Sequence, residues 1–133
     1  MYYYAQYTML PFQVQLKPGL PVYEQVIYAV QKAILKGQLP PGTRFPSVRQ
    51  LSQELRINPN TAHKIITHLM TSGLLQPLPG IGTVVQKAPR ASSEDKSVLL
   101  KDDIERLVVQ AKGLSLTLSE VKRALDHHWE KIS

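Results

Sequence analysis

The chain has 133 residues, 43% of them hydrophobic, and a formal net charge of +6. This length allows one modest hydrophobic core with an appendage. The absence of cysteine excludes disulfides and a Cys-ligated zinc. No apolar run approaches the ~20 residues that a transmembrane helix needs, and the first residues lack the pattern of a signal peptide. We therefore expect a cytoplasmic protein that has no membrane partner.

The first elements that the sequence predicts are a short strand and a helix. Phe12, Val14 and Leu16 alternate with polar residues, which predicts a strand that pairs near a later hairpin. Residues 21–36 then carry apolar side chains at helical spacing, and Gly37 follows as a typical helix stop. We expect one face of this helix to be buried.

Two short helices joined by a tight turn are predicted in the middle of the chain. Ser47, with a glutamine three residues later, fits a capping box at the start of the first helix. Asn58 followed by Pro59 fits the N-cap and the first residue of the second helix. Because only Arg56 and Ile57 separate them, the helices must cross steeply, as in a helix-turn-helix unit. One of these two residues should adopt a strained turn conformation.

The outward face of the second helix carries many hydrogen-bonding side chains and no acid: Asn60, Thr61, His63, Lys64, Thr67 and His68. In the major groove, asparagine pairs with adenine, lysine donates to guanine, and threonine contacts a phosphate or a thymine methyl group. This composition predicts double-stranded DNA as the partner. An ordinary solvated helix face is the alternative interpretation.

Two short apolar runs follow Gly73, a residue typical of the end of a helix. They are interrupted by residues 79–82, in which Gly80 and Gly82 allow the positive φ of a tight turn. The runs predict a β-hairpin, which would make the unit a winged helix. A plain hairpin that only closes the core is compatible with the same residues.

Several ordered motifs together resemble the winged-helix domain of the GntR family of bacterial transcription regulators over residues 12–86: PVYEQV from Pro21, ILKGQLPPG from Ile34, FPSVRQL from Phe45, NPNT from Asn58, GLL from Gly73 and GIGTVV from Gly80. The NPNT variant is familiar in the short YtrA-like branch of this family. The resemblance implies a sequence-specific DNA-binding regulator.

The resemblance also implies DNA contacts at particular residues. Arg49 would contact DNA from the first helix of the motif, the second helix would read bases from its start, and the hairpin turn would act as a wing. The predicted set is Arg44, Ser47, Arg49, Asn58, Asn60, Thr61, His63, Lys64, Gly80, Gly82 and Thr83. Two positions depart from the family pattern. Ile81 stands where wings commonly carry a basic residue, and Pro59 stands where some branches carry a second base-reading arginine.

The charges of the chain are divided unevenly along the sequence. Residues 1–91 hold nine Lys or Arg against two Asp or Glu, whereas residues 92–133 hold seven against eight. A basic part joined to a near-neutral tail fits a DNA-binding module with a separate second role, because phosphate contacts supply most non-specific affinity for DNA. The basic residues are spread over several elements, which fits membrane-surface binding poorly.

The sequence predicts a winged helix-turn-helix domain at residues 12–86, a linker at residues 87–97, and a helical dimerisation or effector segment at residues 98–133. In the last segment, one helix is expected over about 98–112, and a second follows a capping box of Thr117 and Glu120. Their apolar stripes are too broad to bury each other, so a second copy of the chain is the expected partner. The predicted interface residues are Leu100, Ile104, Leu107, Val108, Val121, Leu125 and Trp129.

A homodimer would read two half-sites about 34 Å apart, or a multiple of that distance, so we expect a two-fold symmetric operator. The alternative is an intrachain helical hairpin packed on its own winged helix. The helical segment leaves little room for an enclosed pocket of the ~300 Å³ that ligands commonly need. An unidentified small-molecule effector is left open, and no cofactor is expected.

Catalysis is not expected from these residues. The only acids before residue 92 are Glu24 and Glu54, which provide no paired carboxylates for acid–base chemistry. No nucleophile or phosphate-loop motif is present, and neither histidine pair has the spacing of a metal site. The predicted fold is therefore mostly α with a small β-hairpin wing, and the predicted function is a homodimeric, sequence-specific repressor. The main alternative is a winged-helix module that binds a protein.

Overall fold

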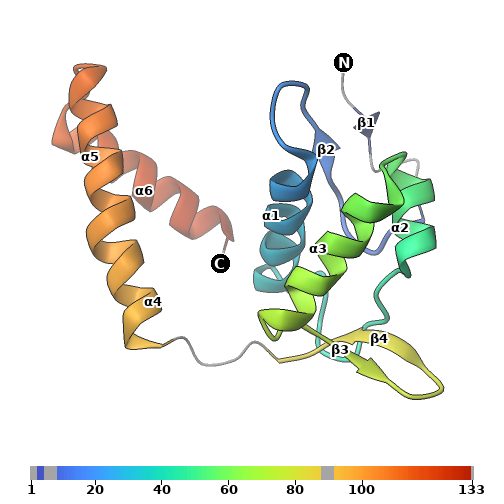
Figure 1. Cartoon of the computed structure of the whole chain (residues 1–133). Coiled ribbons are helices and arrows are strands. Elements are labelled where there is room, and N and C mark those ends of the chain that lie inside the picture. Colours follow the sequence, from blue (N-terminus) through green and yellow to red (C-terminus); the bar gives the residue numbers. More distant parts are fainter. Residues whose placement is uncertain (1–2, 5–8, 88–91, 133) are drawn as a thin grey trace. The chain divides into compact units, whose positions relative to one another are not determined.

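The computed structural model describes residues 3–4, 9–87 and 92–132. The chain divides into two compact units, Met1–Pro89 and Arg90–Ser133 (Figure 1). Within the described residues, no helix is both long enough and apolar enough to cross a membrane.

Three helices form the frame of the first unit: α1 (Val22–Leu35), α2 (Val48–Leu55) and α3 (Pro59–Thr71). Both predicted N-caps are confirmed, although at Ser47 the described residues form only the serine half of the predicted capping box. The Ser47 hydroxyl accepts a hydrogen bond from the Gln50 N–H at 3.1 Å, and the Asn58 side chain accepts one from the Asn60 N–H at 2.7 Å. Arg56 takes the left-handed conformation between α2 and α3, with φ of 54°, which lets the two helices cross within a short turn. The helix-turn-helix prediction is confirmed.

The predicted hairpin follows α3. Strands β3 (Leu75–Leu78) and β4 (Gly82–Val85) pair antiparallel, with Leu75 opposite Val85 and Leu78 opposite Gly82. Gly80 lies in the turn with φ of 78°, a conformation that glycine adopts without steric cost. Helix, turn, helix and hairpin follow one another in the order of a winged helix (Figure 1), so the predicted fold class is confirmed.

The strand prediction near the N-terminus needs a correction. Phe12, Val14 and Leu16 are buried as their alternation predicted, but β2 (Gln15–Leu16) pairs with β1 (Tyr3–Tyr4) and not with the hairpin. The edge of β4 that does not pair with β3 is not available to β2, because residues 42–45 hydrogen-bond along it. Alternation shows which side chains are buried, but it does not identify the neighbouring strand.

The core of the first unit joins all these elements. The fully buried side chains come from the predicted apolar faces of the helices, from the turn after α1 and from the hairpin: Val26, Val30, Leu39, Leu51, Ile65, Leu69, Leu75 and Val85. Phe12 stacks on Phe45 with ring centroids 5.6 Å apart, which fastens the N-terminal segment to the residues that lead into α2. The helix-turn-helix and the hairpin are therefore fixed to one shared core.

The second unit begins as a helix earlier than the sequence predicted. Helix α4 (Ser93–Ser97) continues through a π-helical segment, η2 (Val98–Asp103), into α5 (Ile104–Gly113). The predicted start near residue 98 is wrong because Ser92 and Asp95 form a capping box, in which each backbone N–H donates to the other residue's side chain. The last part of the predicted linker is thus helical.

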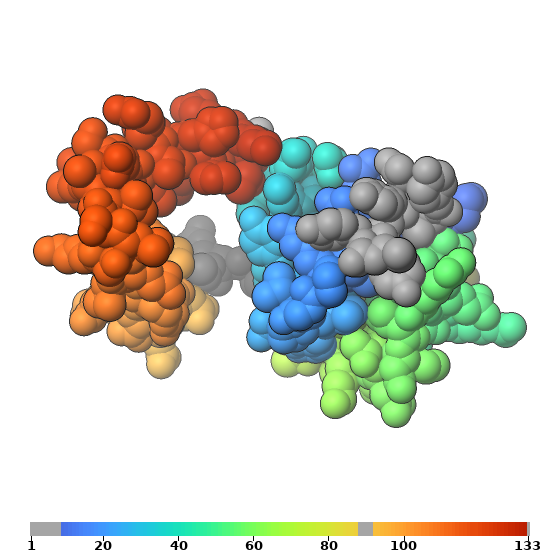
Figure 2. Space-filling view, turned by 90° about the horizontal axis from the view of Figure 1, so that it is seen from above, coloured from blue at the N-terminus to red at the C-terminus, as the bar shows by residue number. Residues whose placement is uncertain are grey.

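Helix α6 (Leu118–Ile132) follows a short turn, and its predicted capping box between Thr117 and Glu120 is confirmed. After this turn α6 diverges from α5 (Figure 1). Among the described residues of this unit only Ala111 is buried, whereas Leu107 and Val121 are half-buried. Ile132 is also half-buried, and the other large apolar side chains of this unit, which is coloured from pale orange to red in Figure 2, are exposed. This unit therefore has almost no core of its own.

Candidate nucleic-acid interface

Helix α3 separates its apolar and polar side chains onto opposite faces. Ala62, Ile65, Ile66 and Leu69 are buried against α1 and α2, which fixes the rotation of α3 about its axis. The predicted reading residues lie on the other face, where Asn58, Asn60, His63 and Lys64 are exposed and Thr61 is half-buried. The structure therefore brings these residues together on one acid-free surface. His68, further along, contacts the Tyr23 ring of α1 edge-on, with centroids 5.8 Å apart.

Two of the predicted contact residues also shape the interface through their caps. The oxygens of Ser47 and Asn58 accept hydrogen bonds from the first turns of α2 and α3. The Ser47 hydroxyl hydrogen and the Asn58 amide hydrogens remain as donors in these geometries. Arg49 is exposed in the first turn of α2. Each of these side chains thus lies at the start of a helix, where backbone N–H groups favour an anion.

The wing is joined to the start of α2 through the backbone. The Gly42 N–H donates to the Val85 carbonyl at 2.7 Å, the Val85 N–H donates to the Thr43 carbonyl at 2.8 Å, and the Phe45 N–H donates to the Thr83 carbonyl at 2.8 Å. Residues 42–45 therefore act as a third strand on β4, immediately before the Ser47 cap. As a result, the wing and the helix-turn-helix unit form one connected surface.

Arg44 lies at the centre of this connection. Its backbone forms an antiparallel bridge with Val84, and its side chain extends to the wing turn, where Nη2 donates to the Ile81 carbonyl at 2.6 Å. Arg44, Gly80, Gly82 and Thr83 all belong to the predicted site, but this contact was not predicted. The two partners lie 37 residues apart, and no local pattern links them.

The interface carries positive charge that the described residues do not neutralise. Among them the one salt bridge is Arg106–Asp103, in the second unit. The Glu54 carboxylate of α2 accepts a hydrogen bond from the Met9 N–H at 3.0 Å, which turns this acid toward the N-terminal segment. Arg44, Arg49 and Lys64 therefore form no salt bridge with a described acid, which leaves their positive charges available to an anionic partner.

A hollow of about 570 Å³ lies between the wing and the start of α2. Arg44, Ser47, Gln50 and Thr83 supply polar groups to its wall, beside the exposed part of Ile81. Met9 and Pro11 of the N-terminal segment also line it, and no acid belongs to its lining. Within the described residues no group of His, Asp or Glu has the arrangement of a metal site.

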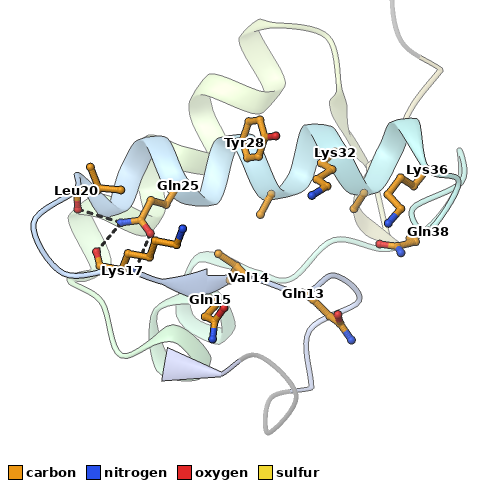
Figure 3. Close-up of a pocket in the computed structure, with 12 residues that line it drawn as sticks. Gln13, Val14, Gln15, Lys17, Leu20, Gln25, Tyr28, Lys32, Lys36 and Gln38 are labelled. Atoms are coloured by element: carbon orange, nitrogen blue, oxygen red, sulfur yellow. Dashed lines mark hydrogen bonds between the residues drawn. The ribbon is translucent and has the colours of Figure 1, made fainter. Parts of the chain in front are cut away.

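A second hollow, of about 440 Å³, lies between α1 and the segment that precedes it (Figure 3). Lys17, Lys32 and Lys36 line it together with several glutamines, and no acid belongs to its lining. One end is held by Gln25, whose Nε2 donates to the carbonyls of Lys17 and Leu20, while its Oε1 accepts from the Lys17 N–H. This hollow suits a small anion and contains none of the predicted DNA-contact residues.

Comparison with known proteins agrees with this geometry. The family model for "Bacterial regulatory proteins, gntR family" matches residues 22–85, which span the three helices and the wing. The HTH-type transcriptional repressor YtrA of Bacillus subtilis (strain 168) is 31% identical over 120 residues, which cover 90% of this chain and 88% of that protein.

Two solved structures extend the comparison. A GntR-family transcription factor, YtrA from Sulfolobus acidocaldarius, is 26% identical with a TM-score of 0.50, and the match covers 84% of this chain and 94% of that one. A structure from Listeria monocytogenes EGD-e described as a transcriptional antiterminator has a TM-score of 0.76 at 24% identity, with 87% of each chain covered. It shows a shared fold. The family model over residues 22–85 and the match to YtrA of Bacillus subtilis over nearly its full length show that this chain belongs to the GntR family of DNA-binding transcription regulators, in the short YtrA-like branch.

Proposed function

We propose that this regulator is a repressor that binds a two-fold symmetric operator as a homodimer in the cytoplasm. The observation that carries the proposal is the exposed, acid-free face of α3, held beside a wing on a basic winged-helix unit. A repressor role is supported by the name of the Bacillus subtilis relative. In this proposal residues 12–86 bind DNA, residues 87–92 connect the units, and the helices from Ser93 onward form the dimer.

The division of roles within the interface follows from the position of each side chain. Asn60, His63 and Lys64 are exposed on α3, so we assign them to base edges in the major groove, with Thr61 beside them. Arg49 at the start of α2, together with the donors of Ser47 and Asn58, is assigned to phosphates, which position the protein without specifying sequence. The wing residues Gly80, Gly82 and Thr83 are assigned to the backbone of the same half-site.

The exposed apolar face of the second unit supports the dimer. Leu100, Ile104, Val108, Leu125 and Trp129 are exposed, and Leu107 and Val121 are half-buried. Two helices that leave most of their apolar side chains uncovered favour a surface for another protein. A second copy of the chain meets this need and also supplies the second reading helix that a two-fold operator requires.

An effector of the regulator, which the sequence leaves open, would find ammonium and amide donors for a small anion in the hollow beside α1. Citrate is a suitable first probe. We expect it to raise the thermal unfolding temperature of the wild type, since a ligand that binds only the folded state stabilises it, and we expect Lys32→Met to reduce this effect. Equal shifts in both proteins would exclude the hollow as the binding site.

The experiment that tests the proposed function is selection of bound duplexes from a random DNA pool at about 150 mM salt, followed by sequencing. Enrichment of an inverted repeat is the expected result, because a two-fold dimer presents two identical reading helices. Enrichment of single half-sites would contradict the dimer while retaining sequence-specific binding. No enrichment would contradict sequence-specific reading and favour a winged-helix module whose α3 face binds a protein.

A further inference from the structure

The wing of this protein carries no charge of its own. From Leu74 to Gln86 the sequence contains no Lys or Arg, and the side chain at the turn, Ile81, is apolar and 48% exposed. Neutralisation of phosphates by Lys and Arg supplies most non-specific affinity for DNA. A wing of this composition needs a cation from elsewhere in the chain if it is to neutralise a phosphate.

Arg44 is the cation that the fold brings to the wing. It precedes α2 in sequence, but the pairing of residues 42–45 with β4 places its backbone opposite Val84. Its guanidinium then reaches the turn and donates from Nη2 to the Ile81 carbonyl at 2.6 Å. The guanidinium charge of Arg44 therefore lies beside Ile81, the wing-turn residue at which this chain has isoleucine and no basic side chain.

The guanidinium has capacity beyond this bond. Arginine carries five N–H donors in a planar group and can hold two acceptors at once. The single salt bridge of the described residues involves a different arginine, so no described carboxylate neutralises Arg44. Beside it lies the hollow of about 570 Å³ that Ser47 and Thr83 also line, which gives a phosphate access to the remaining donors.

We infer that Arg44 has two roles in DNA binding: it braces the wing turn through the Ile81 carbonyl, and it binds a backbone phosphate in the hollow between the wing and α2. Arg44 thus replaces the basic wing residue that this chain lacks. The inference rests on the proposed function, because it requires that the winged-helix unit binds DNA.

The test measures binding to a fluorescent duplex of about 30 base pairs of random sequence, at salt concentrations between about 50 and 200 mM. Arg44→Met removes both the positive charge and the hydrogen bond to the Ile81 carbonyl. Each phosphate contact contributes about 0.9 to the slope of log affinity against log salt. The change occurs twice in the proposed homodimer, so we expect Arg44→Met to reduce the slope by about 1.8 and to weaken binding about 100-fold at ~50 mM salt.

Three further variants make the assignment specific. Ile81→Arg combined with Arg44→Met returns a positive charge to the wing turn without the hydrogen bond from residue 44 to the carbonyl of residue 81. The salt slope should therefore recover. Ile81→Glu keeps Arg44 and places a carboxylate beside it, so it should reproduce the loss in a chain whose brace is intact. Lys96→Met removes the same charge from an exposed position on α4, outside every predicted contact residue, and is the matched control, for which we expect little change in the salt slope.

The outcomes separate the inference from the proposed function. If the wild type binds the duplex with a steep salt slope and Arg44→Met retains that slope, Arg44 does not contact a phosphate and the inference is wrong. An effect of Lys96→Met as large as that of Arg44→Met would also overturn it, because net charge alone would then explain the loss. If the wild type does not bind the duplex at any salt concentration, the proposed function fails, and the inference fails with it.

Discussion

Replacing Trp129 by alanine is expected to dissociate the proposed dimer. Trp129 lies near the end of α6 and is 79% exposed in the single chain. A tryptophan side chain buries about 150–250 Å², so its exposed part offers about 120–200 Å² to a partner. At about 25 cal/mol per Å², covering this area contributes about 3–5 kcal/mol. The change occurs twice in a two-fold dimer, and effects within one interface are not additive.

Allowing for non-additivity, we expect the dimer to lose at least about 4 kcal/mol, which weakens its Kd about 10³-fold. Sedimentation equilibrium over a range of protein concentrations measures this change directly. Tyr28→Ala is the matched control, because Tyr28 is an aromatic residue of α1 that is 59% exposed and outside the predicted interface. A Trp129→Ala protein that dimerises as tightly as the wild type would exclude Trp129 from the interface, and a wild type that stays monomeric would exclude the dimer itself.

Three other predictions concern the winged-helix unit. Leu51→Ala should lower the free energy of unfolding by about 2–5 kcal/mol in a urea titration, because Leu51 is fully buried between α2 and the rest of the core. A loss below ~1 kcal/mol would mean that the site is not packed as described. Arg56→Gly should raise the same quantity by about 1 kcal/mol, because it relieves a left-handed conformation at a non-glycine residue; a lower stability would contradict this. Lys64→Ala should cost about 1–3 kcal/mol in operator affinity and relax selectivity at one position of each half-site. Unchanged selectivity in a repeated selection would exclude Lys64 from base reading.

Features of the fold that depend on neighbouring residues could be predicted from the sequence. The caps at Ser47, Asn58 and Thr117 each involve a side chain and a backbone group within one helical turn, so the required atoms are close in any helical conformation. The strained residue between α2 and α3 followed from the short connection alone, and Arg56 adopts that conformation. The cap at Ser92 is equally local but was missed, because its partner is Asp95 and not the longer Glu or Gln of the usual capping box.

Features that depend on distant residues could not be predicted from a single sequence. The pairing of residues 42–45 with β4, and of β1 with β2, joins segments whose apolar patterns are compatible with several partners. The contact between Arg44 and the Ile81 carbonyl depends on the first of these pairings. The η2 segment required a local departure from the 3.6-residue repeat, which the apolar run at Val98, Leu99 and Leu100 does not indicate.

The two units differ in what holds them together, and this difference connects folding with dimerisation. The first unit has a core of side chains from three helices and a hairpin, whereas the described part of the second unit buries only Ala111. Isolated helices of this length are marginal in water, so we expect that the second unit needs a covering surface to stay folded. If the partner is a second chain, the unfolding temperature of residues 92–132 should rise with protein concentration, since association stabilises by mass action. The unfolding temperature of the winged-helix unit should not change with protein concentration. Circular dichroism of helix content at several concentrations, followed alongside a probe in the winged-helix unit, distinguishes the two transitions. A second unit that melts at the same temperature at every concentration would indicate that it is covered within its own chain.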